Sequence, residues 1–127
     1  MPVLFQHRIY RVDLKNNPTV LYLFGDNALR VGLGGQAKEM RGEKNAIGIA
    51  TKWRPSMEEE AFFSDKDYTA ATRIMRSDMD TALEYARKGG VVVIPSDGLG
   101  TGLSQLPERA PRIYAFLEGM LDGLKRL

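Results

Sequence analysis

The sequence contains no cysteine and a single histidine, His7. Without cysteine the chain has no thiol nucleophile, no thiolate metal site and no disulfide, which fits a reducing compartment. One histidine argues against a histidine-rich metal site and against a histidine-dependent triad. We therefore expect neither a metal ion nor a cofactor, and we expect His7 to pair locally without a catalytic role.

Long apolar runs and a strong excess of one charge are also missing. No apolar segment approaches the ~20 residues that cross a bilayer, and the N-terminus has no basic stretch followed by a long apolar one. Lys+Arg 18 and Asp+Glu 16 give a net charge of +2, which does not by itself point to nucleic acid. These absences predict a cytoplasmic protein with no membrane partner.

The 127 residues, 43% of them hydrophobic, can bury one sizeable core. No repeat, low-complexity tract or linker interrupts them, so residues 1–127 are predicted to form one domain. Apolar runs and periodic segments predict the order β-β-α-β-α-β-α, an α/β sheet with helices on its faces. The predicted strands are 7–12, 20–24, 46–50 and 91–95, and the predicted helices are 34–41, 67–89 and 107–124, with a loop or broken helix over 53–63.

Much of the glycine falls in two loops that each follow an apolar strand. The first loop is 25–36 (GDNALRVGLGGQ), and the second is 96–103 (SDGLGTGL). Glycine lets the backbone approach a ligand closely and adopt positive φ, and free N–H groups at such places attract an anion. Ligands of α/β sheets bind at the carboxyl ends of strands, so the two loops together predict a binding site for a diphosphate.

A simpler interpretation is that these glycines only serve tight strand-to-helix turns. The polar residues Asp26, Asn27, Asp97 and Thr101 beside the glycines favour a ligand site instead. The loops do not match a P-loop, because no Gly-Lys-Ser/Thr ending is present, and the first loop has the wrong spacing for a dinucleotide-binding turn.

Three short motifs resemble the macrodomain family, which binds ADP-ribose. Residues 20–37 resemble the macrodomain strand that ends in Asn and leads through a glycine-rich loop into a helix, and 93–103 resemble the second, phosphate-gripping loop. Residues 49–52 (IATK) are similar to the Thr-Lys strand of the branch that removes terminal ADP-ribose from acidic side chains and from DNA. The resemblance covers roughly residues 8–122 and implies a compact three-layer α/β/α macrodomain-like fold with a mixed central sheet.

The resemblance implies a pocket for ADP-ribose or a related nucleotide. In that pocket Asn27 would face the distal ribose. Asp13 falls near the position of the family's adenine contact, although the glycine that precedes this aspartate in the family is missing here. Asp26 is the alternative candidate for a contact with a ribose or the base. The diphosphate would lie on the backbone amides of two sets of residues, which are Gly32, Gly34 and Gly35 in the first loop and Gly98, Leu99, Gly100, Thr101, Gly102 and Leu103 in the second.

In the branch with the Thr-Lys motif, the lysine attacks the anomeric carbon and an aspartate just after the second loop assists. Lys52 fits the lysine, which can act as a nucleophile only if burial or a neighbouring cation lowers its pKa. Ser104 stands where the aspartate is expected, and Asp97, before the glycines, is the candidate to replace it. The alternative for Lys52 is a solvated lysine at a strand end.

Two other features have two interpretations each. Trp53 either stacks on a base or ribose or packs in the interior. The acidic run 58–60 is either a solvated face or a flap over the pocket.

Three functions are open to such a chain. The first is binding of ADP-ribose with hydrolysis of its linkage to protein or nucleic acid through Lys52. The second is a reader or sequestering protein for ADP-ribose-derived signals without chemistry, which the missing aspartate suits. The third is a protein that kept the fold and lost the ligand, and the glycines argue against it because each costs ~1 kcal/mol in an ordered element.

Overall fold

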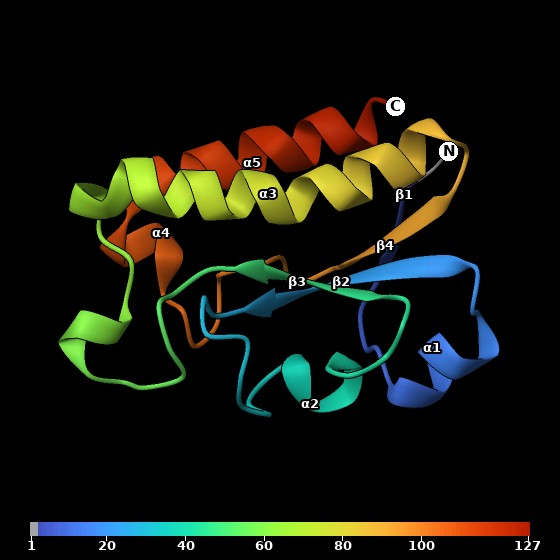
Figure 1. Ribbon diagram of the computed structural model, residues 1–127, viewed down its shortest axis with the longest axis horizontal. Helices are drawn as coiled ribbons and strands as arrows, with labels where there is room; N and C mark the ends of the chain where they lie inside the picture. Colours follow the sequence, from blue (N-terminus) through green and yellow to red (C-terminus); the bar gives the residue numbers. More distant parts are fainter. Residues whose placement is uncertain (1–2) are drawn as a thin grey trace.

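The computed structural model describes residues 3–127, which form a four-stranded sheet with helices on both faces (Figure 1). The strands are β1 (Val3–Gln6), β2 (Val20–Asp26), β3 (Ala46–Ala50) and β4 (Val91–Pro95), and their order in the sheet is β1-β4-β2-β3. All three strand pairs in this part of the chain are parallel, so the expectation of a mixed sheet is wrong. Each strand is joined to the next through a helix, and such crossovers return the chain to the same end of the sheet.

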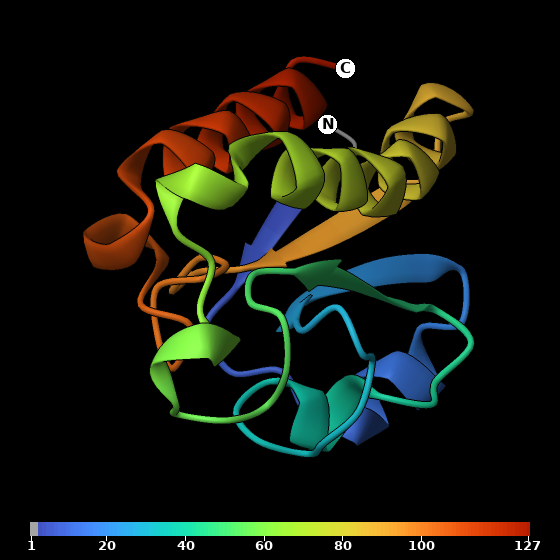
Figure 2. The same ribbon diagram turned by 60° about the vertical axis from the view of Figure 1, so that its left-hand side comes forward.

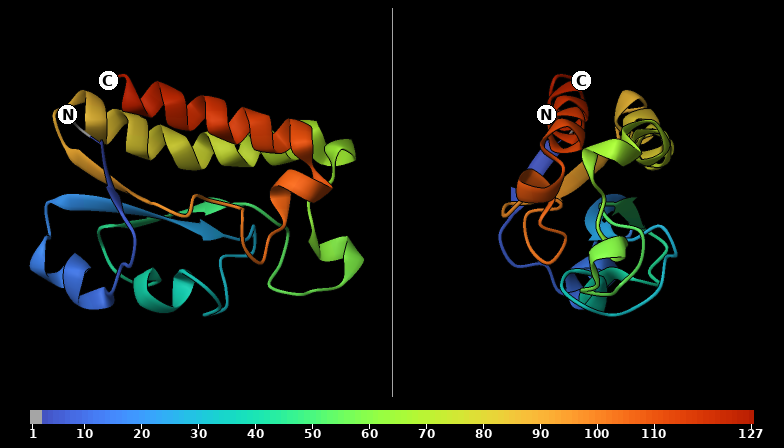
Figure 3. Two further views of the ribbon diagram at one scale, coloured as in Figure 1. Left: turned by 180° about the vertical axis from the view of Figure 1, so that it is seen from behind. Right: turned by 90° about the vertical axis from the view of Figure 1, so that its left-hand side faces the viewer.

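Helices α3 (Tyr68–Arg87) and α5 (Pro111–Lys125) cover one face, and the short helices α1 (Arg11–Asn16) and α2 (Ala37–Met40) cover the other (Figures 1 and 3). The apolar run of β2 serves both faces because successive side chains of a strand point in opposite directions. Leu21 and Leu23 join the core under α3 and α5, whereas Tyr22 and Phe24 pack with α1 and α2. The α/β/α layering therefore follows from a strand that is buried on both sides.

Strands β3 and β4 have the predicted bounds, but the start of the chain differs from the prediction. The predicted strand 7–12 is wrong, because residues 7–10 form a loop and the following residues begin α1. The Asp13 carboxylate accepts a hydrogen bond from the Tyr10 backbone N–H at 2.8 Å, which caps the first turn of α1. The alternating Ile, Tyr and Val residues concealed this helix start.

The last predicted helix is divided into α4 (Leu106–Arg109) and α5. Proline disfavours a helical conformation at the residue before it, and Ala110, which precedes Pro111, has φ −146° and ψ 68°. One apolar side of α5 packs into the core, where Ile113, Leu117 and Leu124 are fully buried. None of the helices between residues 3 and 127 has the length and apolar character that crossing a membrane requires.

The carboxyl ends of all four strands meet at one edge of the sheet, on the left in Figure 1. Four connecting segments leave the sheet there: 7–10, 27–36, 51–58 and 96–105. Figure 2 turns this edge forward and shows these loops, with α4 beside them. Both glycine-rich loops thus lie where ligands of parallel sheets bind.

Candidate functional site

The two glycine-rich loops are held together by Gln36. Its side-chain Oε1 accepts a hydrogen bond from the Gly25 N–H at 2.7 Å, and its Nε2 donates to the Gly98 carbonyl at 3.2 Å. The contact forms because β2 and β4 are neighbours in the sheet although their loops are far apart in the sequence. Sequence reasoning missed this role, since no local pattern marks a side chain that connects two loops.

Backbone N–H groups are left without protein partners in both loops. Between residues 3 and 127, no protein atom accepts a hydrogen bond from the backbone N–H groups of 99–104 or of 32–36. Gly100 is required in this arrangement, because its φ is +78° and an added Cβ would lie 2.9 Å from Leu106 Cδ2. Leu99 is 1% exposed and lines none of the cavities at this edge of the sheet, so the structure does not bring this residue to a ligand site.

Three cavities adjoin one another along the carboxyl edge, in the order of the strands. The His7 cavity, of about 280 Å³, lies at the ends of β1 and β4, and the glycine cavity, of about 310 Å³, lies between the two glycine-rich loops. The Lys52 cavity, of about 420 Å³, lies at the ends of β2 and β3. Neighbouring cavities share lining residues, which are Gly35, Gln36 and Asp97 for the first two and Gly25, Gly34, Leu103 and Ser104 for the last two. The three cavities are therefore neighbours in one row along this edge, and we call the row the cleft.

Asn27 lines the Lys52 cavity and carries a buried acceptor without a partner. The residue is 6% exposed, and its Nδ2 donates to the Val31 carbonyl at 2.8 Å. Its Oδ1 is buried and accepts no hydrogen bond from residues 3–127. Because a buried polar atom without a partner is costly, a hydrogen-bond donor that reached this oxygen, such as a ligand hydroxyl, would stabilise the site.

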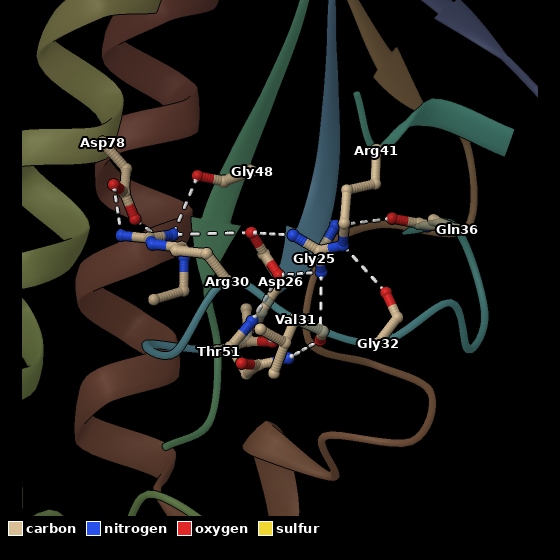
Figure 4. A network of polar contacts seen from close by, with 12 residues as sticks. Gly25, Asp26, Arg30, Val31, Gly32, Gln36, Arg41, Gly48, Thr51 and Asp78 are labelled. Atoms are coloured by element: carbon tan, nitrogen blue, oxygen red, sulfur yellow. Dashed lines mark hydrogen bonds and ion pairs between the residues drawn. The ribbon is translucent and has the colours of Figure 1, made fainter. Parts of the chain in front are cut away.

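Asp26 is already occupied by protein donors (Figure 4). Its carboxylate pairs with Arg41, with 2.5 Å between Oδ1 and Nη2, and lies 3.7 Å from Arg30. Arg41 also donates to the Gly32 carbonyl at 2.8 Å, so the pair holds the first glycine-rich loop. Gly48 makes room for it, because a Cβ there would overlap the carboxylate. The geometry gives Asp26 a role in shaping the site.

This buried pair makes a stability prediction. Replacing Arg41 by Gln leaves the Asp26 carboxylate, whose side chain is 3% exposed, without its main partner. We expect the free energy of unfolding to fall by about 3 kcal/mol in urea titrations. The matched control is Arg87→Gln, which removes an exposed pair with Glu84 and should change stability by less than about 1 kcal/mol. Equal losses in the two variants would contradict the role given to Arg41.

Asp13 lies away from the cleft. Its carboxylate accepts hydrogen bonds from the Tyr10 N–H and from Gln6 Nε2 at 2.9 Å, and it lines none of the three cavities. The structure therefore does not bring Asp13 together with the other residues expected to contact the nucleotide.

Lys52 is buried, so the interpretation as a solvated lysine is wrong. The residue is 6% exposed, and its Nζ donates to the Ser56 carbonyl at 2.6 Å and lies 4.3 Å from the centre of the Phe62 ring. No carboxylate between residues 3 and 127 pairs with it. Burial first, and then the charge of Arg109, lower the pKa of Lys52 below its ordinary value. This amine is therefore neutral more often than that of a surface lysine.

The segment 53–61 folds back beside the lysine. Lys52 and Phe62 form an antiparallel bridge, and the Trp53 N–H donates to the Ala61 carbonyl at 2.7 Å. Trp53 packs edge-to-face on Phe63, with 4.8 Å between ring centres, and lines none of the three cavities. Its packing interpretation is therefore the one that the structure favours.

Ser104, and not Asp97, shares a cavity with Lys52. The Ser104 Oγ lies 2.5 Å from Thr51 Oγ1 and lines both the Lys52 and the glycine cavities. The Asp97 side chain is 75% exposed and lies 3.7 Å from His7 Nδ1. Asp97 lines the glycine cavity and the His7 cavity. The Thr101 hydroxyl donates to the Asp97 carbonyl at 2.6 Å and so shapes the second loop.

The chain matches a known protein family. The model of a family described as "Family of unknown function (DUF7831)" matches residues 4–120. No curated protein and no solved structure matches the chain.

Proposed function

The chain belongs to DUF7831, a family of unknown function, and we propose that it is a macrodomain-like protein that binds ADP-ribose or a related nucleotide in the cleft. The observation that carries the proposal is the order of chemistry along the carboxyl edge. Free amides line the middle of the cleft, and a buried unpaired acceptor lies at the end that holds Lys52. A nucleotide with a central diphosphate and a terminal sugar has the same order of groups.

The glycine cavity suits the diphosphate. The unpartnered N–H groups of 99–104 and 32–36 belong to the two loops that enclose it, and oriented backbone N–H groups of this kind bind anions. The adjoining cavity adds the Lys52 amine, which is positively charged when it is protonated and which no carboxylate between residues 3 and 127 neutralises. Together these groups favour a negatively charged ligand in the middle of the cleft.

The two ends suit the sugar and the base. At one end, Asn27 Oδ1 accepts a hydrogen bond from a hydroxyl of the terminal ribose. At the other end, the His7 cavity has apolar walls from Ile9, Met40 and Pro95 and a polar edge that includes Glu39. A flat heterocyclic base placed there would bury its faces against the apolar walls. This position replaces the base contact that was expected from Asp13.

Hydrolysis is a second candidate function, and the burial of Lys52 favours it. The neutral amine would form a bond to the anomeric carbon of the terminal ribose while the bond from that carbon to the attached group breaks. The attached group takes the proton that the amine loses. Water then displaces the lysine, which releases ADP-ribose and restores the amine. Ser104 stands where the macrodomain branch that the sequence resembles has an aspartate, so binding without hydrolysis is the other outcome of the test.

Calorimetry tests the binding proposal. We expect ADP-ribose to bind more tightly than ADP, because only ADP-ribose has the terminal ribose that reaches Asn27. Asn27→Ala should weaken ADP-ribose binding by about tenfold, which corresponds to the loss of roughly one hydrogen bond, and leave ADP binding nearly unchanged. The control is Asn16→Ala at an exposed position of α1. No heat with ADP-ribose, ADP or NAD at millimolar concentration would overturn the proposal.

A further inference from the structure

Arg109 lies on the same aromatic ring as Lys52. The centre of the Phe62 ring is 3.7 Å from Arg109 Cζ and 4.3 Å from Lys52 Nζ. Phe62 is 4% exposed, so the ring is a fixed part of the interior. The guanidinium of Arg109 and the amine of Lys52 thus share one buried ring. The amine has no acidic partner between residues 3 and 127.

Contacts outside the lysine hold the guanidinium in this place. Arg109 Nη1 lies 2.9 Å from the Glu59 carboxylate, and its Nε donates to Gln105 Oε1 at 2.8 Å. Arg109 belongs to α4, which begins directly after the second glycine-rich loop, whereas Lys52 follows β3. The two cations are therefore brought together by the fold, from opposite parts of the sequence.

We propose that Arg109 is a positioning residue for Lys52: from its place on Phe62, the guanidinium opposes protonation of the amine and keeps it available for reaction. The inference rests on the proposed role of Lys52 in hydrolysis. Like charges close together in a water-poor site disfavour the charged form of the one that can lose its proton. Arginine does not lose its proton at any pH that the protein meets, so the effect falls on the lysine.

The other charged groups around Lys52 do not cancel this effect. Glu59 pairs with Arg109, but its side chain is 82% exposed and its charge is screened by water. Across the cavity, Asp26 is balanced by Arg41 and Arg30. On the 53–61 segment, the exposed residues Arg54 and Glu58 pair with each other. Among residues 3–127, Arg109 is the cation that shares the Phe62 ring with Lys52.

Competitive acetylation with acetic anhydride tests the inference, because only the neutral amine reacts. The reactivity of each lysine is read by mass spectrometry over a range of pH, with exposed Lys88 as the internal reference. We expect Arg109→Gln to lower the reactivity of Lys52 severalfold at neutral pH, and Arg109→Lys to restore most of it. Arg112→Gln is the matched control, because it removes an arginine from another ring, that of Tyr68 at 4.6 Å, and should leave Lys52 unchanged.

An unchanged profile in Arg109→Gln, or an equal loss in Arg109→Lys, would overturn the inference. The labelling needs no nucleotide, so its result does not depend on ADP-ribose binding. If the protein does not bind ADP-ribose but shows the expected reactivities, the proposed function is wrong and the inference about Arg109 stands.

Discussion

Replacing Lys52 by methionine is expected to reduce the release of ADP-ribose from a modified protein by at least about a thousandfold, because the substitution removes the attacking amine. Methionine keeps an apolar stem on Phe62, and Lys52 makes no ion pair between residues 3 and 127, so the fold should persist. Released ADP-ribose is measured by chromatography, with the urea midpoint of each variant as the check on folding. Lys44→Met at an exposed position is the control.

The pH dependence of this reaction has a defined sign. Because the pKa of Lys52 is lowered, the fraction of neutral amine rises with pH and levels off below the range of ordinary lysines. The rate should therefore rise and level off in the same way. Hydrolysis that survives Lys52→Met would refute the lysine mechanism. If the unaltered protein binds ADP-ribose without hydrolysis, the protein belongs to the reader or sequestering class.

Placing a carboxylate in the glycine cavity is expected to weaken ADP-ribose binding by about thirtyfold or more. Gly102 is the position for this change, because it lines the cavity and an added Cβ would meet nothing within 4 Å. Gly102→Asp therefore adds a negative charge beside the diphosphate with little steric conflict. At an effective dielectric constant of about 20, two unit charges a few ångströms apart repel by several kcal/mol before screening by salt.

Gly102→Asn is the matched control for this prediction, because it has nearly the same shape without the charge. We expect the asparagine variant to bind within about threefold of the unaltered protein, and the aspartate variant to recover part of its affinity at high salt. Both affinities are measured by calorimetry. Equal affinities of the two variants would show that no anionic group lies in the glycine cavity.

The sequence predicted most of the sheet, for a physical reason. Strands β3 and β4 are short apolar runs between turn residues, and this combination of length and boundaries is typical of buried strands. The start of the chain was mispredicted because the cap of α1 depends on one contact of Asp13 with Tyr10, which alternation of apolar residues does not reveal. Strand direction also depends on the whole topology, so a parallel sheet could not be distinguished from a mixed one.

From local patterns alone, the candidate site was predictable where it is made of backbone. Glycine-rich loops after apolar strands indicated the cleft, because glycine at strand ends is a local signal. Three contacts were hidden from the sequence: the connection of the loops by Gln36, the occupation of Asp26 by Arg41, and the shared ring of Lys52 and Arg109. Each joins residues that are distant in the chain, and a single sequence does not show which distant residues meet.

The most direct test of the nucleotide site is an amide NMR titration of the ¹⁵N-labelled protein with ADP-ribose. If the diphosphate lies in the glycine cavity, the largest shifts should fall on the amides of 99–104 and 32–36, which have no protein acceptor between residues 3 and 127. The Asn27 side-chain amide should move with them, and the amides of α3 should stay in place. Absence of shifts at saturating ADP-ribose, or shifts confined to residues outside the cleft, would contradict the proposal.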